Sequence, residues 1–237
     1  MHLTMLFAHH GIEIIDGDRA AVFDTVEAAT GVLLKLAIGY AHPEARAFTT
    51  LHAGAVCKQG GAILLPAVTG SGKTTLSGYL IANGWRYGGD DVVGIGRFDA
   101  HEAIQLAPFP TALGVKDGSV EILRPHYPAL ADAQIVSYGS KSVRYVSCED
   151  KVAPMGGDWR TVRALVFPRY DRDSRLRFDA LPASDALRMI LEAGWGDGLA
   201  LDPTGFDLLL EAVNDLPAYS LQYSSLQDAA AALDGLI

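Results

Sequence analysis

Short runs with the hydrophobic and polar pattern of strands open the chain, and a longer apolar-rich segment follows them. Residues 12–14 and 21–23 form brief strand-like runs with the period of two. Residues 26–40 instead carry apolar side chains at the spacing of a helix. The pattern therefore predicts a small β element followed by one helix. Together they form a cap element that spans residues 1–45.

The most regular pattern lies between residues 51 and 95. The uninterrupted apolar run at residues 62–65 predicts a strand, and residues 76–80 have helical spacing until Asn83-Gly84 supplies a helix stop. Two extended runs follow at residues 85–87 and 92–95. This order predicts a strand, a helix and two further strands of an α/β fold.

The remainder of the chain continues a single main domain, predicted over residues 46–237. Residues 107–154 are rich in Pro, Gly and Ser, so substrate recognition by loops is expected between about residues 108 and 160. Ser184 is expected to cap a helix. Strands are predicted at residues 120–123, 142–146 and 164–167, and helices at residues 185–193, 206–213 and 226–237.

The segment from Thr69 to Thr75 has the composition of a phosphate-binding loop. Its small residues let successive backbone N–H groups point into one concavity, Lys73 adds positive charge for the β- and γ-phosphates, and the Thr74 hydroxyl can ligate Mg²⁺. The strict pattern has glycine where this chain has Ala67, which fits only with a negative φ. A hairpin turn without a ligand is the alternative, but the flanking strand and helix favour phosphate binding.

Two adjacent carboxylates, Asp90 and Asp91, follow this loop after one helix and one strand. Beside a phosphate site, one acid can hold the metal while the other accepts a proton from an attacking hydroxyl. Neighbouring side chains on a strand point to opposite faces, so the two acids share a site only if the backbone bends, and Gly88-Gly89 is expected to provide the bend. The alternative is an ordinary solvated turn.

Taken in order, these features resemble a known family. His52, the apolar strand, Gly-Ser-Gly-Lys-Thr-Thr, a helix ending in Asn-Gly-Trp-Arg and the acids Asp90-Asp91 are similar to the catalytic domain of HPr kinase/phosphorylase. The shorter HPr-kinase-related proteins, which include kinases that tailor lasso peptides, are the most similar. The resemblance implies a phosphoenolpyruvate-carboxykinase-like fold, in which a P-loop and an Asp-Asp pair lie on a mixed β-sheet with flanking helices.

The resemblance also implies roles for individual residues. Thr74 and Asp90 would hold Mg²⁺, and Asp91 would be the base, although the division between the two acids stays open. His52 would lie near the γ-phosphate and sense or donate a proton, or else be a buried structural imidazole. ATP would be held by Thr69, Gly70, Ser71, Gly72, Lys73, Thr74 and Thr75. Further candidates are Lys116, Lys141, Arg144 and Arg169 as phosphate clamps and Glu121 as a metal ligand.

Composition narrows the classes of partner. The 237 residues are 49% hydrophobic and 20% charged, which suits a compact enzyme with a substantial core. The net charge of −9 argues against nucleic acid. There is no signal pattern, and the longest apolar stretch, residues 31–41, is too short for a membrane span, so a cytoplasmic protein without membrane contact is expected. Cys57 and Cys148 are expected to be reduced thiols.

The sequence therefore favours an ATP-dependent, Mg²⁺-requiring kinase whose acceptor is a serine hydroxyl of a peptide or protein. A small-molecule kinase is one alternative, and a nucleotide-binding regulatory module without an acceptor is another. About fifty residues precede His52, fewer than the extra N-terminal domain of true HPr kinases needs, so a role in sugar-uptake regulation is not expected. A homo-oligomer stays open, because the related kinases form hexamers but no feature of this chain demands one.

Overall fold

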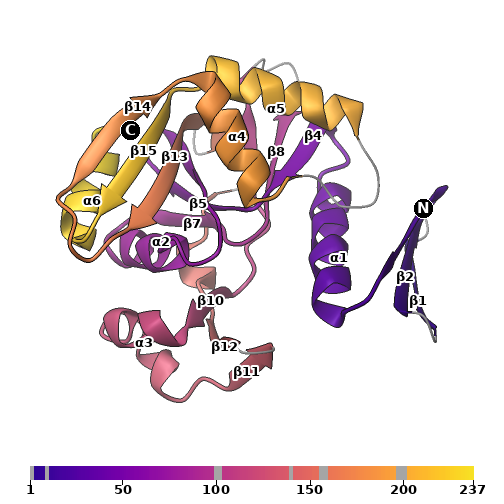
Figure 1. Cartoon of the computed structure of the whole chain (residues 1–237), viewed down its shortest axis with the longest axis horizontal. Helices are drawn as coiled ribbons and strands as arrows, with labels where there is room; N and C mark the ends of the chain where they lie inside the picture. The colour runs from indigo at the N-terminus through magenta and orange to yellow at the C-terminus, as the bar shows by residue number, and fades with distance from the viewer. Residues whose placement is uncertain (1–2, 9–10, 99–102, 139–140, 155–159, 196–201) are drawn as a thin grey trace.

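A mixed six-stranded sheet is the central layer of the molecule (Figure 1). The computed structural model describes residues 3–8, 11–98, 103–138, 141–154, 160–195 and 202–237, and the sheet is counted within these ranges. Its strands, in spatial order, are β14 (Arg177–Leu181), β15 (Ala218–Tyr223), β13 (Val162–Tyr170), β6 (Gly61–Pro66), β5 (Ala53–Lys58) and β7 (Arg86–Gly89). The mixed sheet with flanking helices confirms the α/β fold class that the sequence predicts.

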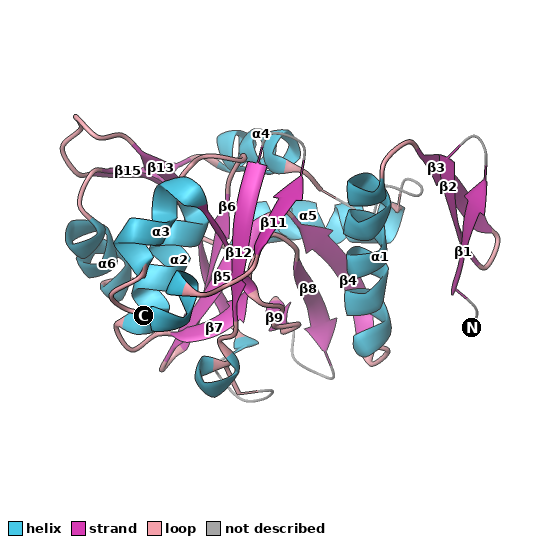
Figure 2. Ribbon diagram, turned by 90° about the horizontal axis from the view of Figure 1, so that it is seen from below, coloured by secondary structure: helices cyan, strands magenta, loops and turns pink. Residues whose placement is uncertain are grey.

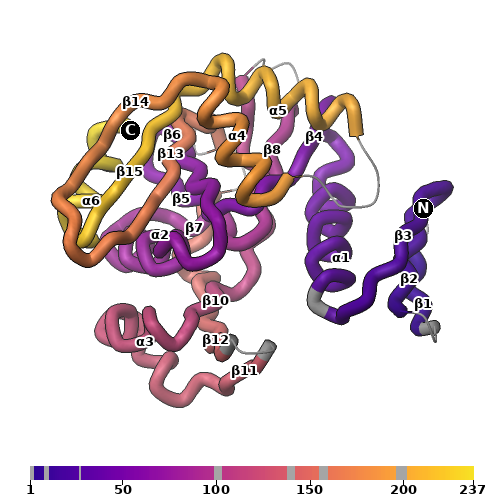
Figure 3. Tube along the Cα trace, in the orientation of Figure 1, coloured from indigo at the N-terminus to yellow at the C-terminus, as the bar shows by residue number. Residues whose placement is uncertain are grey.

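Three strands of this sheet run parallel, and their carboxyl ends meet at one edge. β13 pairs in parallel with both β6 and β15. The tube in Figure 3 shows these three strands side by side although they are far apart in the sequence. Ligands of open α/β sheets bind at the carboxyl ends of parallel strands, so this edge is where a site is expected.

Helices cover both faces of the sheet (Figures 1 and 2). α2 (Lys73–Ala82) and α6 (Leu226–Asp234) pack on one face, whereas α4 (Ala183–Ala193) and α5 (Pro203–Asp215) pack on the other. Along β6, Ile63 and Leu65 belong to the first core while Ala62 and Leu64 belong to the second. This explains why the run at residues 62–65 is apolar without alternation, because a strand covered on both faces has no polar side.

A second, antiparallel sheet adjoins the central one. Its strands are β4 (Ala45–Leu51), β8 (Val93–Phe98) and β9 (Gln105–Ala107), in that order. β4 pairs with β8 along its whole length, and α5 packs against β4. Within the described residues, β4 is therefore an edge strand, and its last residue, Leu51, leads directly to His52.

A third sheet lies below the central one in Figure 1 and consists of β10 (Leu113–Lys116), β12 (Lys141–Val146) and β11 (Ile135–Tyr138). Helix α3 (Asp117–Leu123) follows β10, and short 3-10 helices span Pro128–Ala131 and Glu149–Lys151. The strand predicted at residues 120–123 is wrong, since these residues form the end of α3. Val120 and Leu123, three residues apart on one helix face, are buried, and a run of four apolar residues does not distinguish such a face from a strand.

The N-terminal residues form the β meander and helix that their pattern predicts. β1 (Leu3–Ala8), β2 (Gly11–Asp16) and β3 (Arg19–Phe23) pair in order, and α1 (Val26–Ala41) begins after Thr25, whose hydroxyl accepts a hydrogen bond from the Ala28 N–H. In Figure 2, α1 lies between this meander and β4. The division of the chain at residue 45 stays a prediction. No described helix combines the length and apolar content needed to cross a membrane.

The C-terminal helices occur where the sequence predicts them, with one difference at a cap. Ser225 caps α6 by accepting a hydrogen bond from the Asp228 N–H. Ser184 does not cap α4, because that helix already begins at Ala183 and Pro182 occupies the cap position. Proline sets the extended backbone that precedes the helix, so the cap lies at Pro182, two residues before the predicted cap Ser184.

Candidate functional site

The phosphate loop has the backbone shape that its glycines predict. It connects Pro66, the last residue of β6, to Lys73, the first residue of α2. Gly70 and Gly72 have φ values of 89° and 91°, which few other residues adopt. Ala67 is not among the residues with positive φ, so alanine fits there without strain, as predicted. Gly72, at the cap position of α2, supplies no side-chain acceptor, and the Lys73 N–H makes only a long hydrogen bond of 3.4 Å to the Ser71 hydroxyl, so this helix start suits an anion.

Two tyrosines from distant strands hold this loop in place. The Tyr170 N–H donates to the Ser71 carbonyl over 2.8 Å, and the Tyr223 hydroxyl donates to the Gly72 carbonyl over 3.2 Å. The two rings contact each other edge to face, with centroids 5.8 Å apart. Tyr170 and Tyr223 end β13 and β15, so the parallel strands beside β6 support the loop directly.

Gly72→Ala is expected to weaken nucleotide binding by about tenfold or more, because a left-handed φ costs an L-residue about 1–2 kcal/mol. A Cβ at this position would also lie 2.7 Å from the Tyr223 hydroxyl and 2.9 Å from the Tyr170 Cβ. Titration of each variant with a fluorescent ATP analogue measures the effect. Gly31→Ala in α1 is the control, since no atom lies within 4 Å of its Cβ position. Equal affinity in both variants would contradict the assignment of the loop.

Lys73 brings together side chains from three elements. Its side chain is 6% exposed, and its Nζ lies 3.3 Å from the His52 Nε2 and 3.3 Å from the Asp91 Oδ1. His52 comes from the junction of β4 and β5, and Asp91 from the junction of β7 and β8. A cation, an imidazole and a carboxylate that the sequence places almost forty residues apart therefore meet at one point.

His52 is held as a neutral ring. Burial and the neighbouring Lys73 ammonium lower the pKa of His52 to about 4, with Asp91 acting in the opposite direction. The backbone N–H of His52 donates to the Gly194 carbonyl over 2.8 Å, which fixes the residue from the other side. A neutral imidazole at pH 7 favours a role as hydrogen-bond acceptor for Lys73 over a role as proton donor.

Asp90 lies deeper than its neighbour and faces the start of α2. It is 3% exposed, and its Oδ2 accepts a hydrogen bond of 2.9 Å from the Thr74 hydroxyl. Its Oδ1 is buried and has no hydrogen-bond partner among the described residues. Burial raises the pKa of Asp90 to about 6, although Lys73 and Thr74 oppose the rise. An unsatisfied carboxylate oxygen beside a threonine hydroxyl fits a hard divalent cation, which takes oxygen ligands.

Asp90→Asn is expected to stabilise the ligand-free protein at pH 8 by at most about 3 kcal/mol, at about 1.4 kcal/mol per pKa unit. Above about pH 6 the wild type buries a charged carboxylate, whereas below about pH 4 both folded and unfolded states hold the proton and the gain disappears. Denaturant unfolding at pH 8 and pH 4 measures it, with the exposed Asp132→Asn as control. An equal gain at both pH values would contradict burial of a charge at Asp90.

The backbone is irregular at Gly88-Gly89, where the pairing of β7 with β5 shifts register, and it turns sharply at Asp91. Gly88 and Gly89 are still part of β7, whereas the Val92 N–H donates to the Asp90 carbonyl over 2.8 Å and closes a γ-turn centred on Asp91. Asp91 has a φ of 63° and is the one non-glycine residue with positive φ within the described ranges. This rare turn sends Asp90 into the core and leaves Asp91 with a 60% exposed side chain beside Lys73.

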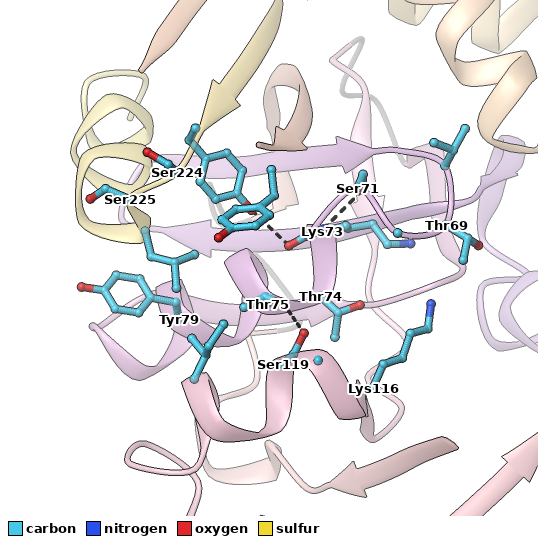
Figure 4. Close-up of a pocket in the computed structure, with 18 of the residues that line it drawn as sticks. Thr69, Ser71, Lys73, Thr74, Thr75, Tyr79, Lys116, Ser119, Ser224 and Ser225 are labelled. Carbon is cyan, nitrogen blue, oxygen red and sulfur yellow. Dashed lines mark hydrogen bonds between the residues drawn. The ribbon is translucent and has the colours of Figure 1, made fainter. Parts of the chain in front are cut away.

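A cavity of about 550 Å³ extends from these residues along α2. Figure 4 shows the amino groups of Lys73 and Lys116 at one end and Tyr79, Ser224 and Ser225 at the other. All seven residues from Thr69 to Thr75 line it, together with His52 and Asp91. Asp90 lies behind this lining, where it contacts Thr74. The structure thus brings together His52, the loop from Thr69 to Thr75, Asp90 and Asp91.

Several lining residues carry no signal in the sequence. They are Ser119, Ile122, His126, Tyr170, Tyr223, Ser224, Ser225, Leu226 and Gln227. Ser119 in α3 forms a short hydrogen bond with the Thr75 hydroxyl, and His126 packs edge to face on Tyr79. The one rule that could have found the C-terminal members is that parallel strands place their carboxyl ends together, and it needs the strand order.

The predicted phosphate clamps and metal ligand downstream of Asp91 differ in whether they line the cavity. Of the four predicted clamps, Lys116 lines the cavity, whereas Arg144 forms an ion pair with Asp117 over 2.7 Å. Arg169 is exposed on β13 and is not among the described lining residues. The side chain of Lys141 lies outside the described part of the chain. Glu121 is exposed, forms an ion pair with Arg124 over 2.7 Å and is not among the described residues that line the cavity, so its role as a metal ligand stays a prediction.

The chain has matches among solved structures. No protein-family model matches the chain, and no curated protein matches it. Among solved structures, the chain is similar to the HPr(Ser) kinase/phosphatase from Coxiella burnetii, with 10% sequence identity and a TM-score of 0.36 over 79% of this chain and 92% of that chain. This similarity is low and does not indicate a function for the chain.

Proposed function

We propose that this protein is an ATP-dependent, Mg²⁺-requiring kinase that transfers the γ-phosphoryl group to the hydroxyl of a serine in a peptide or protein. The observation that carries the proposal is the meeting of Lys73 with His52 and Asp91 at the end of a phosphate loop. The acceptor class follows the resemblance to the short HPr-kinase-related proteins that tailor lasso peptides.

The shape of the cavity supports binding of a nucleoside triphosphate. The loop N–H groups and Lys73 offer donors to the β- and γ-phosphates, and Lys116 adds a second cation at the same end. The opposite end is lined by Tyr79 and Leu226, whose apolar surfaces suit the base and ribose. The nucleotide would therefore lie along α2 with its γ-phosphate toward Asp91.

Thr74 and Asp90 are the residues that would hold Mg²⁺. The buried oxygen of Asp90 that lacks a partner is the observation that supports this assignment. Bound with the nucleotide, the ion would neutralise charge on the β- and γ-phosphates. Gly54 leaves room beside this oxygen, because a Cβ there would lie 3.4 Å from the Asp90 Oδ1 and 2.8 Å from the Ser77 hydroxyl oxygen.

In the proposed transfer, Asp91 accepts the proton of the acceptor hydroxyl as its oxygen bonds to the γ-phosphorus. The bond from that phosphorus to the β,γ-bridging oxygen breaks, and ADP leaves with that oxygen. Lys73 stabilises the charge on the transferring group, and neutral His52 holds the Lys73 ammonium in place. Asp91 suits the role of base because its side chain is exposed toward the cavity.

Incubation with γ-labelled ATP and Mg²⁺ tests the proposal. Serine peptide pools and a panel of hydroxylated metabolites are offered separately, and labelled product is identified by mass spectrometry. Phosphoserine in a peptide supports the proposal, whereas label in a metabolite alone would replace it with a small-molecule kinase. ATP binding without any product would favour a regulatory module.

A further inference from the structure

Lys116 faces the phosphate loop from the opposite wall of the cavity. It is the last residue of β10 in the third sheet and directly precedes α3, whereas the loop leads from the central sheet into α2. In Figure 4 its side chain extends from the start of α3 toward the amino group of Lys73 and the side chain of Thr74. The cavity therefore has one lysine on each side of the place where the terminal phosphates of a nucleotide would lie.

The wall that carries this lysine is packed tightly on α2. The two helices approach closely at Gly78, where a Cβ would lie 3.0 Å from a methyl carbon of Leu123 in α3. The Tyr127 hydroxyl donates to the Gly78 carbonyl over 2.8 Å, and the hydroxyls of Ser119 and Thr75 share a short hydrogen bond. The backbone of the lysine is thus held in a fixed position relative to the loop, as a preorganised charge requires.

The Lys116 ammonium has no carboxylate partner among the described residues. The adjacent Asp117 forms its ion pair with Arg144 over 2.7 Å. Asp91, the one carboxylate in the described lining of the cavity, lies 3.3 Å from the Lys73 Nζ. A cation that no neighbouring carboxylate neutralises favours an anionic ligand at this end of the cavity.

The position of this charge matches the γ-phosphate. After burial and Lys73, the Lys116 charge also contributes to lowering the pKa of His52 to about 4, so it acts at the end of the cavity that holds His52 and Asp91. A phosphate loop surrounds the β-phosphate with its N–H groups, and its own lysine reaches the β- and γ-phosphates. The phosphate that can be contacted from the opposite wall is therefore the γ-phosphate, whose oxygens carry the charge during transfer.

We infer that Lys116 is a second catalytic cation, which binds the γ-phosphoryl oxygens from the wall opposite the loop before and during transfer. This inference rests on the proposed kinase function and adds to it the residue by which the site distinguishes ATP from ADP. Lys73 contacts both the β- and γ-phosphates, whereas Lys116 contacts the γ-phosphate alone. Removal of the Lys116 ammonium should therefore weaken ATP binding and slow transfer but leave ADP binding unchanged.

Calorimetric titration of the full chain with Mg²⁺ and either ADP or the non-hydrolysable analogue AMP-PNP tests this contact. Lys116→Ala is expected to bind AMP-PNP about tenfold more weakly than wild type and ADP within about twofold of wild type, because a charge-assisted contact to one phosphate is lost. Lys116→Arg keeps the charge and should keep most of the preference. Lys58→Ala removes a lysine that does not line the described cavity and is the matched control. An equal change for both nucleotides in Lys116→Ala, or no change for either, would overturn the inference.

Single-turnover transfer from saturating ATP to the serine peptide pool separates a catalytic role from a structural one. Lys116→Ala is expected to lower the rate about a hundredfold, the lower end of the loss when one preorganised donor is removed. Lys116→Met removes the charge but keeps the length of the side chain, so its rate should fall equally while its thermal unfolding matches wild type. A wild-type rate in Lys116→Met would overturn the inference.

The two measurements distinguish failure of this inference from failure of the kinase proposal. A preference for AMP-PNP over ADP that Lys116→Ala removes supports the inference even if no serine is phosphorylated. Phosphorylation of serine at equal rates by wild type and Lys116→Ala would overturn the inference and leave the kinase proposal standing. A wild-type protein that binds AMP-PNP no more tightly than ADP would also overturn it.

Discussion

Lys73→Ala is expected to lower turnover by about a thousandfold, the upper end of the loss seen when one preorganised donor to a transition-state charge is removed. The ammonium lies in a buried position between His52 and Asp91, where little water can replace it. Nucleotide affinity is expected to fall as well, because the same group binds the β- and γ-phosphates in the ground state.

Steady-state kinetics and isothermal titration with ATP measure the two effects of Lys73→Ala. Lys58→Ala is the control, since Lys58 lies at the end of β5 and forms an ion pair with Asp234 at the surface. A Lys73→Ala protein that binds ATP with wild-type affinity and turns over at a wild-type rate would show that the loop does not hold the phosphates.

Asp91→Asn is expected to reduce kcat by about a hundredfold to ten-thousandfold, the usual contribution of a general base, while ATP affinity stays within about threefold of wild type. Asparagine keeps the size of the side chain and is among the few residues that tolerate a positive φ, so the γ-turn at φ 63° should persist. The loss is then one of proton acceptance and not of backbone geometry.

Single-turnover transfer and ATP titration on the same preparation test Asp91→Asn. Asp91→Ala is the companion variant, because alanine removes the carboxylate and also strains the turn, so it should lose stability as well as rate. An equal loss of ATP affinity in Asp91→Asn and Lys73→Ala would contradict the division of roles between the two residues.

Local signals account for the parts of the site that the sequence predicts well. The loop from Thr69 to Thr75 needs small residues and one lysine in a short stretch, and the strand before it and the helix after it have their own hydrophobic periods. The acids Asp90-Asp91 follow at a separation that one helix and one strand require. All these requirements are met within about thirty consecutive residues.

The predictions that are wrong or incomplete lie where one local sequence pattern is compatible with two backbone structures. The apolar residues 120–123 suit either a strand or one face of a short helix, and packing of Val120 and Leu123 against the core selects the helix. Gly88-Gly89 is the site of a register shift in the pairing of β7 with β5, as a bend there requires, but the turn that separates the two acids forms at Asp91, where that pairing has ended. In both cases the choice depends on contacts with residues distant in sequence.

The sequence by itself determined that a glycine-rich loop joins an apolar strand to a helix and that two acids follow it, because those features depend on neighbours along the chain. Only the tertiary structure decided that Tyr170 and Tyr223 brace the loop and that His52 reaches Lys73. The physical reason is that strand order and sheet packing, which periodicity does not encode, place the ends of distant strands together.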